Sequence, residues 1–177
     1  GKVVVPAEIL TKPGRLSVPE YELVKSHAGA AGEILSGIEW SGPVMQTILQ
    51  HHERLDGSGY PLGLKGDAII PEARVVAVAD VFEAMVSHRP YRPALTPNVA
   101  IAELRDGAGR CYDGEVVDAS GRVGQEVGDG DAAVAVRAEG ALRAEQGVLA
   151  DLAAGGDGAE ALGEGFAVQA LEVGLGV

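Results

Sequence analysis

The amino-acid sequence predicts an all-α fold, a bundle of helices joined by turns. Helix-start signals, in which Ser, Thr or Asp is followed closely by Pro or Glu, recur along the first two thirds of the 177-residue chain. Apolar residues after these signals recur every three or four positions, which is the spacing of one helix face. Gly and Pro separate the stretches, and the clean alternation typical of strands is missing. These three observations favour helices packed on helices.

The first helix is predicted to begin at Ser17 and to run to about Leu35. Ser17 and Glu20 form a capping box, in which the N-cap and the third helical residue satisfy each other's backbone N–H groups. The face expected to point inward comprises Leu23, His27, Ala30, Ala31 and Ile34.

Four further helices are predicted downstream. They begin at Ser41 with Pro43, at Pro71, at Thr96 with Pro97, and at Asp113. The helix after Pro43 runs into His51 and His52, where DGSGYPLG ends it. The helix after Pro71 reads ARVVAVADVFEAMVS, and its valines leave a strand open as an alternative.

The composition changes near Arg122. Only 2 of the 14 basic residues follow it, against 10 of the 26 acidic residues, and the last 55 residues hold 12 Gly and 13 Ala. Gly, Ala, Val, Asp and Glu are the five amino acids whose codons begin with G. A segment made mostly of these five is typical of a GC-rich gene read in the wrong frame. We therefore predict one domain over residues 1–121 and a low-complexity tail over residues 122–177, either disordered or out of frame.

The net charge, the cysteine count and the length of the apolar runs exclude several classes of protein. A net charge of −12 argues against nonspecific binding to DNA or to anionic membranes. The single cysteine, Cys111, excludes an internal disulfide and fits a reducing compartment, so we expect a cytoplasmic protein. No apolar run reaches the roughly 18–20 residues of a membrane-spanning helix, so this chain is expected to have no membrane segment.

The adjacent histidines His51 and His52 are the first candidates for chemistry. Consecutive helical residues point about 100° apart, so the pair is not expected to chelate one ion comfortably, although it can serve two neighbouring ions. The structural alternative is a cationic helix end, because His suits the negative end of the helix dipole.

Two further residues point to a shared metal centre. His27 lies on the apolar face of its helix, and Asp80 lies among apolar neighbours in VVAVADVF, where an ionised carboxylate needs a partner. A metal bound by His and carboxylate side chains of several helices satisfies both. Glu83, one turn after Asp80, is either a base or hydrogen-bond partner at this centre or a solvated surface acid. A hydrogen-bonded core histidine is the alternative for His27.

The loop SHRPYRPAL supplies candidates for phosphate binding. Arg89 and Arg92 flank Tyr91 shortly after the helix that carries Asp80. A guanidinium matches phosphate oxygens in bidentate geometry, and a Tyr ring can stack on a base. Ordinary surface arginines are the alternative, and His88 is expected at the surface.

The segments HHERLDGSGYP, VVAVADVFEAM and RPYR resemble the HD-GYP subgroup of the HD-domain phosphohydrolases. The opening GKVVVPAEILTKPGRLSVPEYELVKSH is similar to the stretch that follows the His-Asp doublet of that family. The resemblance covers about residues 1–120 and implies an HD-domain-like helical bundle that binds two or three divalent metal ions, most often iron or manganese. It also implies hydrolysis of cyclic di-GMP to the linear dinucleotide or GMP, in bacterial second-messenger signalling.

The resemblance implies roles for single residues as well. Positions that match metal ligands are His27, His51, His52 and Asp80. Lys2 matches the lysine of the family's HDxGK motif, which approaches the phosphate. Arg89 and Arg92 match the basic pair that binds the ligand, and Tyr60 matches a residue that lines the site. Gly57 and Gly59 are expected to supply unusual backbone angles to the turn that ends at Pro61.

The family's His-Asp doublet would lie immediately before Gly1, and it is absent from this sequence. We therefore expect a partial domain, cut from a parent protein that carries an upstream sensor or receiver domain. An active cyclic di-GMP phosphodiesterase is one hypothesis. A degenerate module that binds cyclic di-GMP or a partner protein without catalysis is the alternative, and a phosphohydrolase for another nucleotide is a third possibility.

Overall fold

The computed structural model describes residues 1–88 and 92–127, with side chains described as far as residue 122. Within this part of the chain every regular element is helical, as predicted. The elements in order are η1 (Lys2–Val4), α1 (Ala7–Leu10), α2 (Val18–Leu35), α3 (Val44–Gln50), η2 (Gly66–Ala68), α4 (Pro71–Val86), α5 (Pro97–Asp106) and α6 (Gly114–Val127). The strand alternative for the valine-rich segment is wrong, because that segment forms α4.

The starts predicted at Ser17, Pro71, Thr96 and Asp113 are confirmed, whereas α3 begins at Val44 with Pro43, not Ser41, as its N-cap. Local chemistry explains two of the confirmed starts. The Glu20 carboxylate accepts hydrogen bonds from the backbone N–H and the hydroxyl of Ser17, both at 2.7 Å, and Lys12 binds the same carboxylate. At α6 the Asp113 carboxylate accepts the N–H groups of Glu115 and Val116, at 3.1 and 3.4 Å. Both side chains satisfy N–H groups that have no partner within their own helix.

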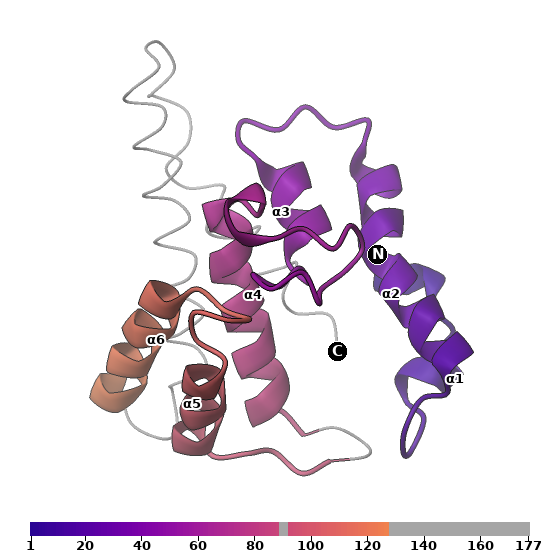
Figure 1. Ribbon diagram of the computed structural model, residues 1–177. Helices are drawn as coiled ribbons and strands as arrows, with labels where there is room; N and C mark the ends of the chain where they lie inside the picture. The colour runs from indigo at the N-terminus through magenta and orange to yellow at the C-terminus, as the bar shows by residue number, and fades with distance from the viewer. Residues whose placement is uncertain (89–91, 128–177) are drawn as a thin grey trace, which may run out of the picture.

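The helices form two groups that share α4 (Figure 1). α2 packs on α3, and α3 packs on α4. On the other side α5 and α6 pack on each other and on α4. Because α4 contacts both groups, side chains on α4 can face residues that come from α2 and α3.

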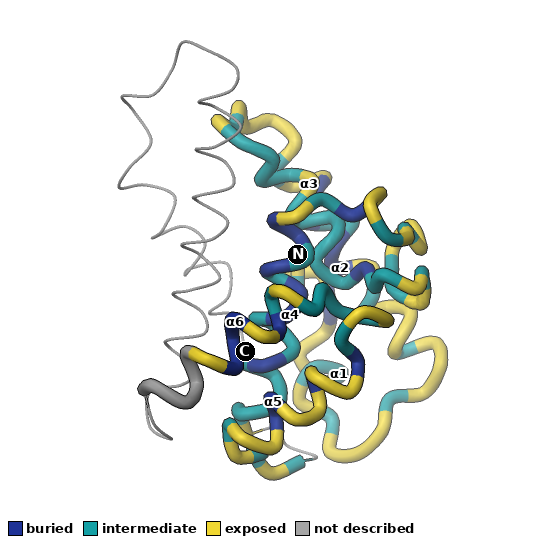
Figure 2. Tube along the Cα trace, turned by 60° about the vertical axis from the view of Figure 1, so that its left-hand side comes forward, coloured by how far each residue is buried: buried dark blue, intermediate teal, exposed yellow. Residues whose placement is uncertain are grey.

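The main apolar core lies between α4, α5 and α6. Its buried residues are Val78, Phe82, Ala100, Ile101, Leu104 and Val117. Buried positions also lie in the middle of α2, whereas none of the residues of α1 is buried (Figure 2). Between α2 and α3 the helices approach closely, since a Cβ on Gly32 would lie 2.9 Å from a methyl group of Leu49.

The inward face predicted for α2 is only partly right. Its buried residues are His27, Ala28, Ala31 and Gly32. Leu23 and Ile34, which were expected to point inward, are 39% and 57% exposed. Helical spacing identifies the residues that share one face of a helix. It does not tell how much of that face a neighbouring helix covers. In this fold α3 covers the part of α2 near Gly32.

The predicted domain boundary at residue 121 falls inside α6, which continues to Val127. The remainder of the predicted tail lies outside the described residues, and the boundary stays a prediction. No described helix is both long and apolar enough to cross a membrane.

Candidate metal centre

Three histidines from two parts of the chain converge beside α3. Among the described residues, His27, His51 and His52 form a group in which one ligand nitrogen of each lies within 4.8 Å of the other two. The Nε2 atoms of His27 and His52 are 3.1 Å apart. The ring centroids of His51 and His52 are 3.9 Å apart, and that of His27 lies 4.9 Å from His52. We call this group the histidine triad.

Backbone carbonyl groups fix the orientation of two members of the triad. His27 Nδ1 lies 2.6 Å from the carbonyl oxygen of Val24, and His51 Nδ1 lies 2.6 Å from that of Ile48. A carbonyl only accepts, so each Nδ1 carries the proton, and each Nε2 then holds a free lone pair. An imidazole held in this way is prepared to bind a metal through Nε2.

The environment keeps the triad neutral. Burial lowers the pKa of His27 and of His51 below the ordinary value of 6.5. Burial, followed by the neighbouring His51 and His27, lowers the pKa of His52 to about 2. The imidazoles are therefore uncharged near neutral pH, which is the state that binds a metal cation.

The geometry does not require that the adjacent residues His51 and His52 bind separate ions. The expectation of divergent side chains assumed that both histidines lie within a helix. α3 ends at Gln50, so His51 is its C-cap and His52 lies in the following turn. Their rings are inclined by only 40°, and their nitrogens share the space beside His27.

Asp80 lies next to the triad but is not buried. Its side chain is 38% exposed, so the expectation of a buried carboxylate is wrong. The apolar neighbours of Asp80 in the sequence pack into the core on the other faces of α4. The carboxylate lies 3.9 Å from His52 Nδ1. Its charge also acts on His51 and His27, where it raises the pKa against the lowering by burial, and its role as a metal ligand stays a prediction.

The two residues predicted to be catalytic lie in different surroundings. The Lys2 ammonium is close enough that its charge contributes to the lowered pKa of all three histidines. A Cβ on Gly1 would collide with the carbonyl of His27, so a glycine lets this segment lie against α2. Glu83, one turn beyond Asp80, accepts a hydrogen bond from the Ser87 hydroxyl at 2.6 Å.

Tyr60 covers one face of the triad. Its ring stacks on that of His52, with centroids 4.6 Å apart and planes inclined by 28°. Burial raises the pKa of its phenol above the ordinary value, so the group is a neutral hydroxyl. The sequence placed Tyr60 at this site through the resemblance alone, and the structure brings it against a triad histidine.

Gly57 and Gly59, two of the glycines in the GYP loop (residues 55–66), serve different purposes. Gly57 has φ of +82°, as expected. Gly59 has no positive φ, so the expected unusual angle is wrong there. A Cβ on Gly59 would lie 2.4 Å from the Cα of Glu53, so this glycine is needed for close approach. The Tyr60–Pro61 peptide bond is cis.

The predicted phosphate-binding arginines are only partly described. Arg89 lies outside the described residues, as does Tyr91. Arg92 donates to the carbonyl oxygens of Ala84 and Met85, at 2.7 and 3.3 Å, and so binds the C-terminal end of α4. His88 is exposed, as expected.

Two residues near the triad were missed by the sequence reasoning. The Lys25 ammonium lies 5.3 Å from the ring centroid of Tyr21 and 5.8 Å from that of Tyr60, while it pairs with Glu22. Glu53 is buried directly after the histidine pair. The signal that could have identified Glu53 in the sequence is its position as a charged residue within a motif of histidines and glycines. For Lys25, the only signal is its place two residues before His27.

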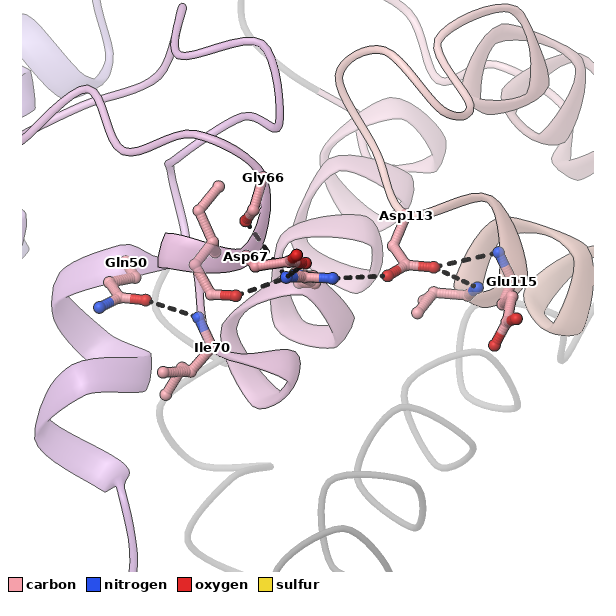
Figure 3. Close-up of polar contacts among 9 residues, drawn as sticks. Gln50, Gly66, Asp67, Ile70, Asp113 and Glu115 are labelled. Carbon is pink, nitrogen blue, oxygen red and sulfur yellow. Dashed lines mark hydrogen bonds and ion pairs between the residues drawn. The ribbon is translucent and has the colours of Figure 1, made fainter.

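A polar network joins the segments that carry the site (Figure 3). The Gln50 side chain, at the end of α3, accepts the backbone N–H of Ile70, just before α4. Arg74 on α4 binds the carbonyl oxygen of Gly66 and the carboxylates of Asp67 and Asp113. These contacts fix the end of α3 and the GYP loop to the start of α4 and α6.

The family model for the HD domain matches residues 1–116. The chain belongs to the HD domain family, and its assignment to the HD-GYP type is confirmed by its relatives. It is 47% identical over 121 residues to the cyclic di-GMP phosphodiesterase response regulator RpfG of Xanthomonas campestris. It is 42% identical over 133 residues to a cyclic di-GMP phosphodiesterase of Thermotoga maritima.

A 3'3'-cGAMP-specific phosphodiesterase of Vibrio cholerae is 42% identical over 105 residues. These three matches cover 67%, 73% and 59% of this chain, in the same order. They cover 32%, 36% and 24% of the relatives, so the chain spans about a third or less of each of these proteins.

Proposed function

We propose that the chain is part of a metal-dependent phosphodiesterase that hydrolyses cyclic di-GMP to the linear dinucleotide or GMP in second-messenger signalling. The observation that carries this proposal is the histidine triad, three neutral imidazoles whose ligand nitrogens lie within 4.8 Å of one another. Relatives named as cyclic di-GMP phosphodiesterases support the substrate.

The residues present fit a divalent metal. Imidazole nitrogens with a carboxylate nearby suit Fe, Mn or Zn, and we propose two or three ions, with Fe or Mn as the occupants. His27, His51 and His52 hold them, with Asp80 as a further ligand. Divalent metal ions supply Lewis acidity, which activates water and offsets the charge that develops on phosphate oxygens.

The chain's own side chains do the remaining work. Lys2 offsets phosphate charge beside the triad, and Arg89 and Arg92 hold the second phosphate or the base. Tyr60 presents a neutral hydroxyl and a ring edge to the nucleotide. Glu83 holds or accepts a proton next to Asp80, with Ser87 as its hydrogen-bond partner.

The substrate has a second candidate. The Vibrio cholerae relative is named for 3'3'-cGAMP, which differs from cyclic di-GMP in one base, and it is 42% identical over its matched region. A module that binds the nucleotide or a partner protein without catalysis is the other alternative. In its favour, the Asp80 carboxylate is 38% exposed and lies 3.9 Å from His52 Nδ1, too far for a hydrogen bond.

One assay separates these functions. The chain is incubated with Mn²⁺ or Fe²⁺ and with each cyclic dinucleotide, and products are resolved by chromatography while binding is measured in parallel. Faster loss of cyclic di-GMP than of 3'3'-cGAMP supports the first proposal, and the reverse order supports the second. Binding without turnover supports the non-catalytic module and overturns catalysis by this chain.

The parent protein is proposed to be larger and cytoplasmic. The chain spans 32% of a relative named as a response regulator, which supports fusion to an upstream receiver or sensor domain. The single cysteine supports a reducing compartment.

A further inference from the structure

Glu53 is a buried carboxylate with two partners in the GYP loop. It is 2% exposed and lies directly after His52. One carboxylate oxygen accepts the backbone N–H of Leu62 at 2.7 Å, and the other accepts that of Leu64 at 2.9 Å. Burying a carboxylate is strongly unfavourable unless strong hydrogen bonds satisfy it. Charge-assisted bonds to backbone N–H groups are of that kind, so the loop and the carboxylate require each other.

The loop is held on both sides of Tyr60. Before the ring, the backbone N–H of Tyr60 donates to the carbonyl oxygen of His52 at 3.3 Å. After it, Leu62 and Leu64 donate to Glu53. Gly59 fits against the backbone of residues 52–54 with no room for a side chain. The position of the Tyr60 ring is therefore set by contacts to the residues around the histidine pair.

The Tyr60 ring in turn restricts the imidazole of His52. That imidazole lies between two rings, His51 at 3.9 Å and Tyr60 at 4.6 Å between centroids. Its Nε2 faces His27 at 3.1 Å, and its Nδ1 faces Asp80 at 3.9 Å. If Tyr60 moves away, His52 loses one of the two rings that fix its plane, and Nε2 is no longer held toward His27.

We propose that Glu53 is a positioning residue of the metal centre, which holds the GYP loop so that Tyr60 orients His52 for metal binding. This inference rests on the proposed function, because it assumes that the triad binds a metal. Glu53 touches neither metal nor substrate in this proposal, and it acts through Tyr60.

The first test is Glu53→Gln, read by calorimetric titration with Mn²⁺ alone. The amide presents one oxygen and one NH₂ group to two N–H donors, so one donor loses its acceptor. Loss of a partner that orients a ligand weakens metal binding by about 10- to 100-fold, and we expect at least tenfold here. Glu103→Gln, an exposed carboxylate on α5, removes the same charge and is expected to leave the affinity unchanged.

A double-mutant cycle with Tyr60→Ala tests the route of the effect. If Glu53 acts through Tyr60, Glu53→Gln weakens Mn²⁺ binding at least tenfold in the native background and less than twofold in Tyr60→Ala. An equal loss in both backgrounds, or native affinity in Glu53→Gln, overturns the proposal.

A second pair of variants leaves Glu53 in place and tests the proposal even if Glu53→Gln does not fold. Leu62→Pro deletes the N–H that binds the carboxylate, and Leu62→Ala keeps it. Leu62 is 68% exposed, so loss of its side chain costs little. We expect weaker Mn²⁺ binding in Leu62→Pro alone, and equal affinities in the two variants overturn the proposal.

A readout without metal separates this inference from the proposed function. The Tyr60 ring shifts the NMR signals of the His52 ring protons, and that shift should shrink in Glu53→Gln and Leu62→Pro but not in Leu62→Ala. A native chain that binds no Mn²⁺ overturns the metal-dependent function, whereas an unchanged ring-current shift in both variants overturns the role of Glu53.

Discussion

The Nε2 atoms of His27 and His52 lie 3.1 Å apart, although 25 residues separate them in the sequence. His27 comes from the middle of α2, and His52 from the turn after α3. The packing of α2 on α3, with Gly32 against Leu49, brings the two rings together. Two neutral imidazoles whose nitrogens meet at this distance need either a shared proton or a cation between them, and the third nitrogen of His51 favours the cation.

Replacing His52 tests the triad without disturbing the helices. His52→Ala should weaken Mn²⁺ binding by at least about 100-fold, since loss of a ligand should cost no less than loss of a group that orients one. Helix content should stay nearly unchanged, because His52 lies beyond the end of α3. Calorimetry and circular dichroism measure both effects. His88→Ala, which removes an exposed histidine, is the control. Unfolding of metal-free His52→Ala would show that His52 is a structural residue.

Gly59→Ala should destabilise the fold through the GYP loop. The added Cβ would lie 2.4–2.5 Å from backbone atoms of residues 52–54, which have little freedom to move. Overpacking of this kind costs about 1–3 kcal/mol. Gly29→Ala on α2 is the matched control, because its Cβ meets nothing within 4 Å. That change should stabilise the protein by about 0.5–1 kcal/mol. Urea titrations of both variants give the two free energies, and a Gly59→Ala variant as stable as the native chain contradicts the close approach.

The core between α4, α5 and α6 should dominate the stability. Leu104→Ala removes a fully buried side chain and should lower the free energy of unfolding by about 2–5 kcal/mol. Val99→Ala, on an exposed position of the same helix, should change it by less than about 0.5 kcal/mol. Thermal or urea denaturation measures the difference, and similar values for the two variants would contradict the assigned core.

The Glu20 carboxylate should make stability depend on pH in the acid range. Its bond to Lys12, followed by those to Ser17, lowers the pKa of Glu20 from 4.5 to about 2. Between these values the unfolded chain binds a proton that the folded chain does not, so stability rises with pH. The contribution is complete above pH 4.5 and is lost as the pH falls toward 2. Denaturation from pH 6 to 2 should show a shallower dependence in Glu20→Gln. The exposed Glu33→Gln is the control, and equal slopes in both variants would contradict this role.

The fold was predictable where its signals are local. The starts of α2, α4, α5 and α6 follow from Ser17, Pro71, Thr96 and Asp113, because caps act within one helical turn. The short elements η1, α1 and η2 were missed, since three or four residues are too few to display a period. The exposure of Leu23 and Ile34 was missed because it depends on which neighbour packs where.

The site was predictable through the residue types and the resemblance, not through its geometry. His27 was placed inward correctly by its helical spacing. Asp80 was expected to be buried from its apolar sequence neighbours, but a helix among apolar residues still has one face toward solvent. Glu53 carries no periodic signal, and its role depends on contacts to a loop nine and eleven residues further along the chain.

The central claim is that the histidine triad is a metal centre, and anomalous diffraction from crystals grown with Mn²⁺ tests it most directly. The account predicts an Mn²⁺ peak within bonding distance of the Nε2 atoms of His27, His51 and His52, and no such peak in crystals of His52→Ala. Mn²⁺ bound elsewhere, or a triad that stays without metal at saturating Mn²⁺, would contradict it.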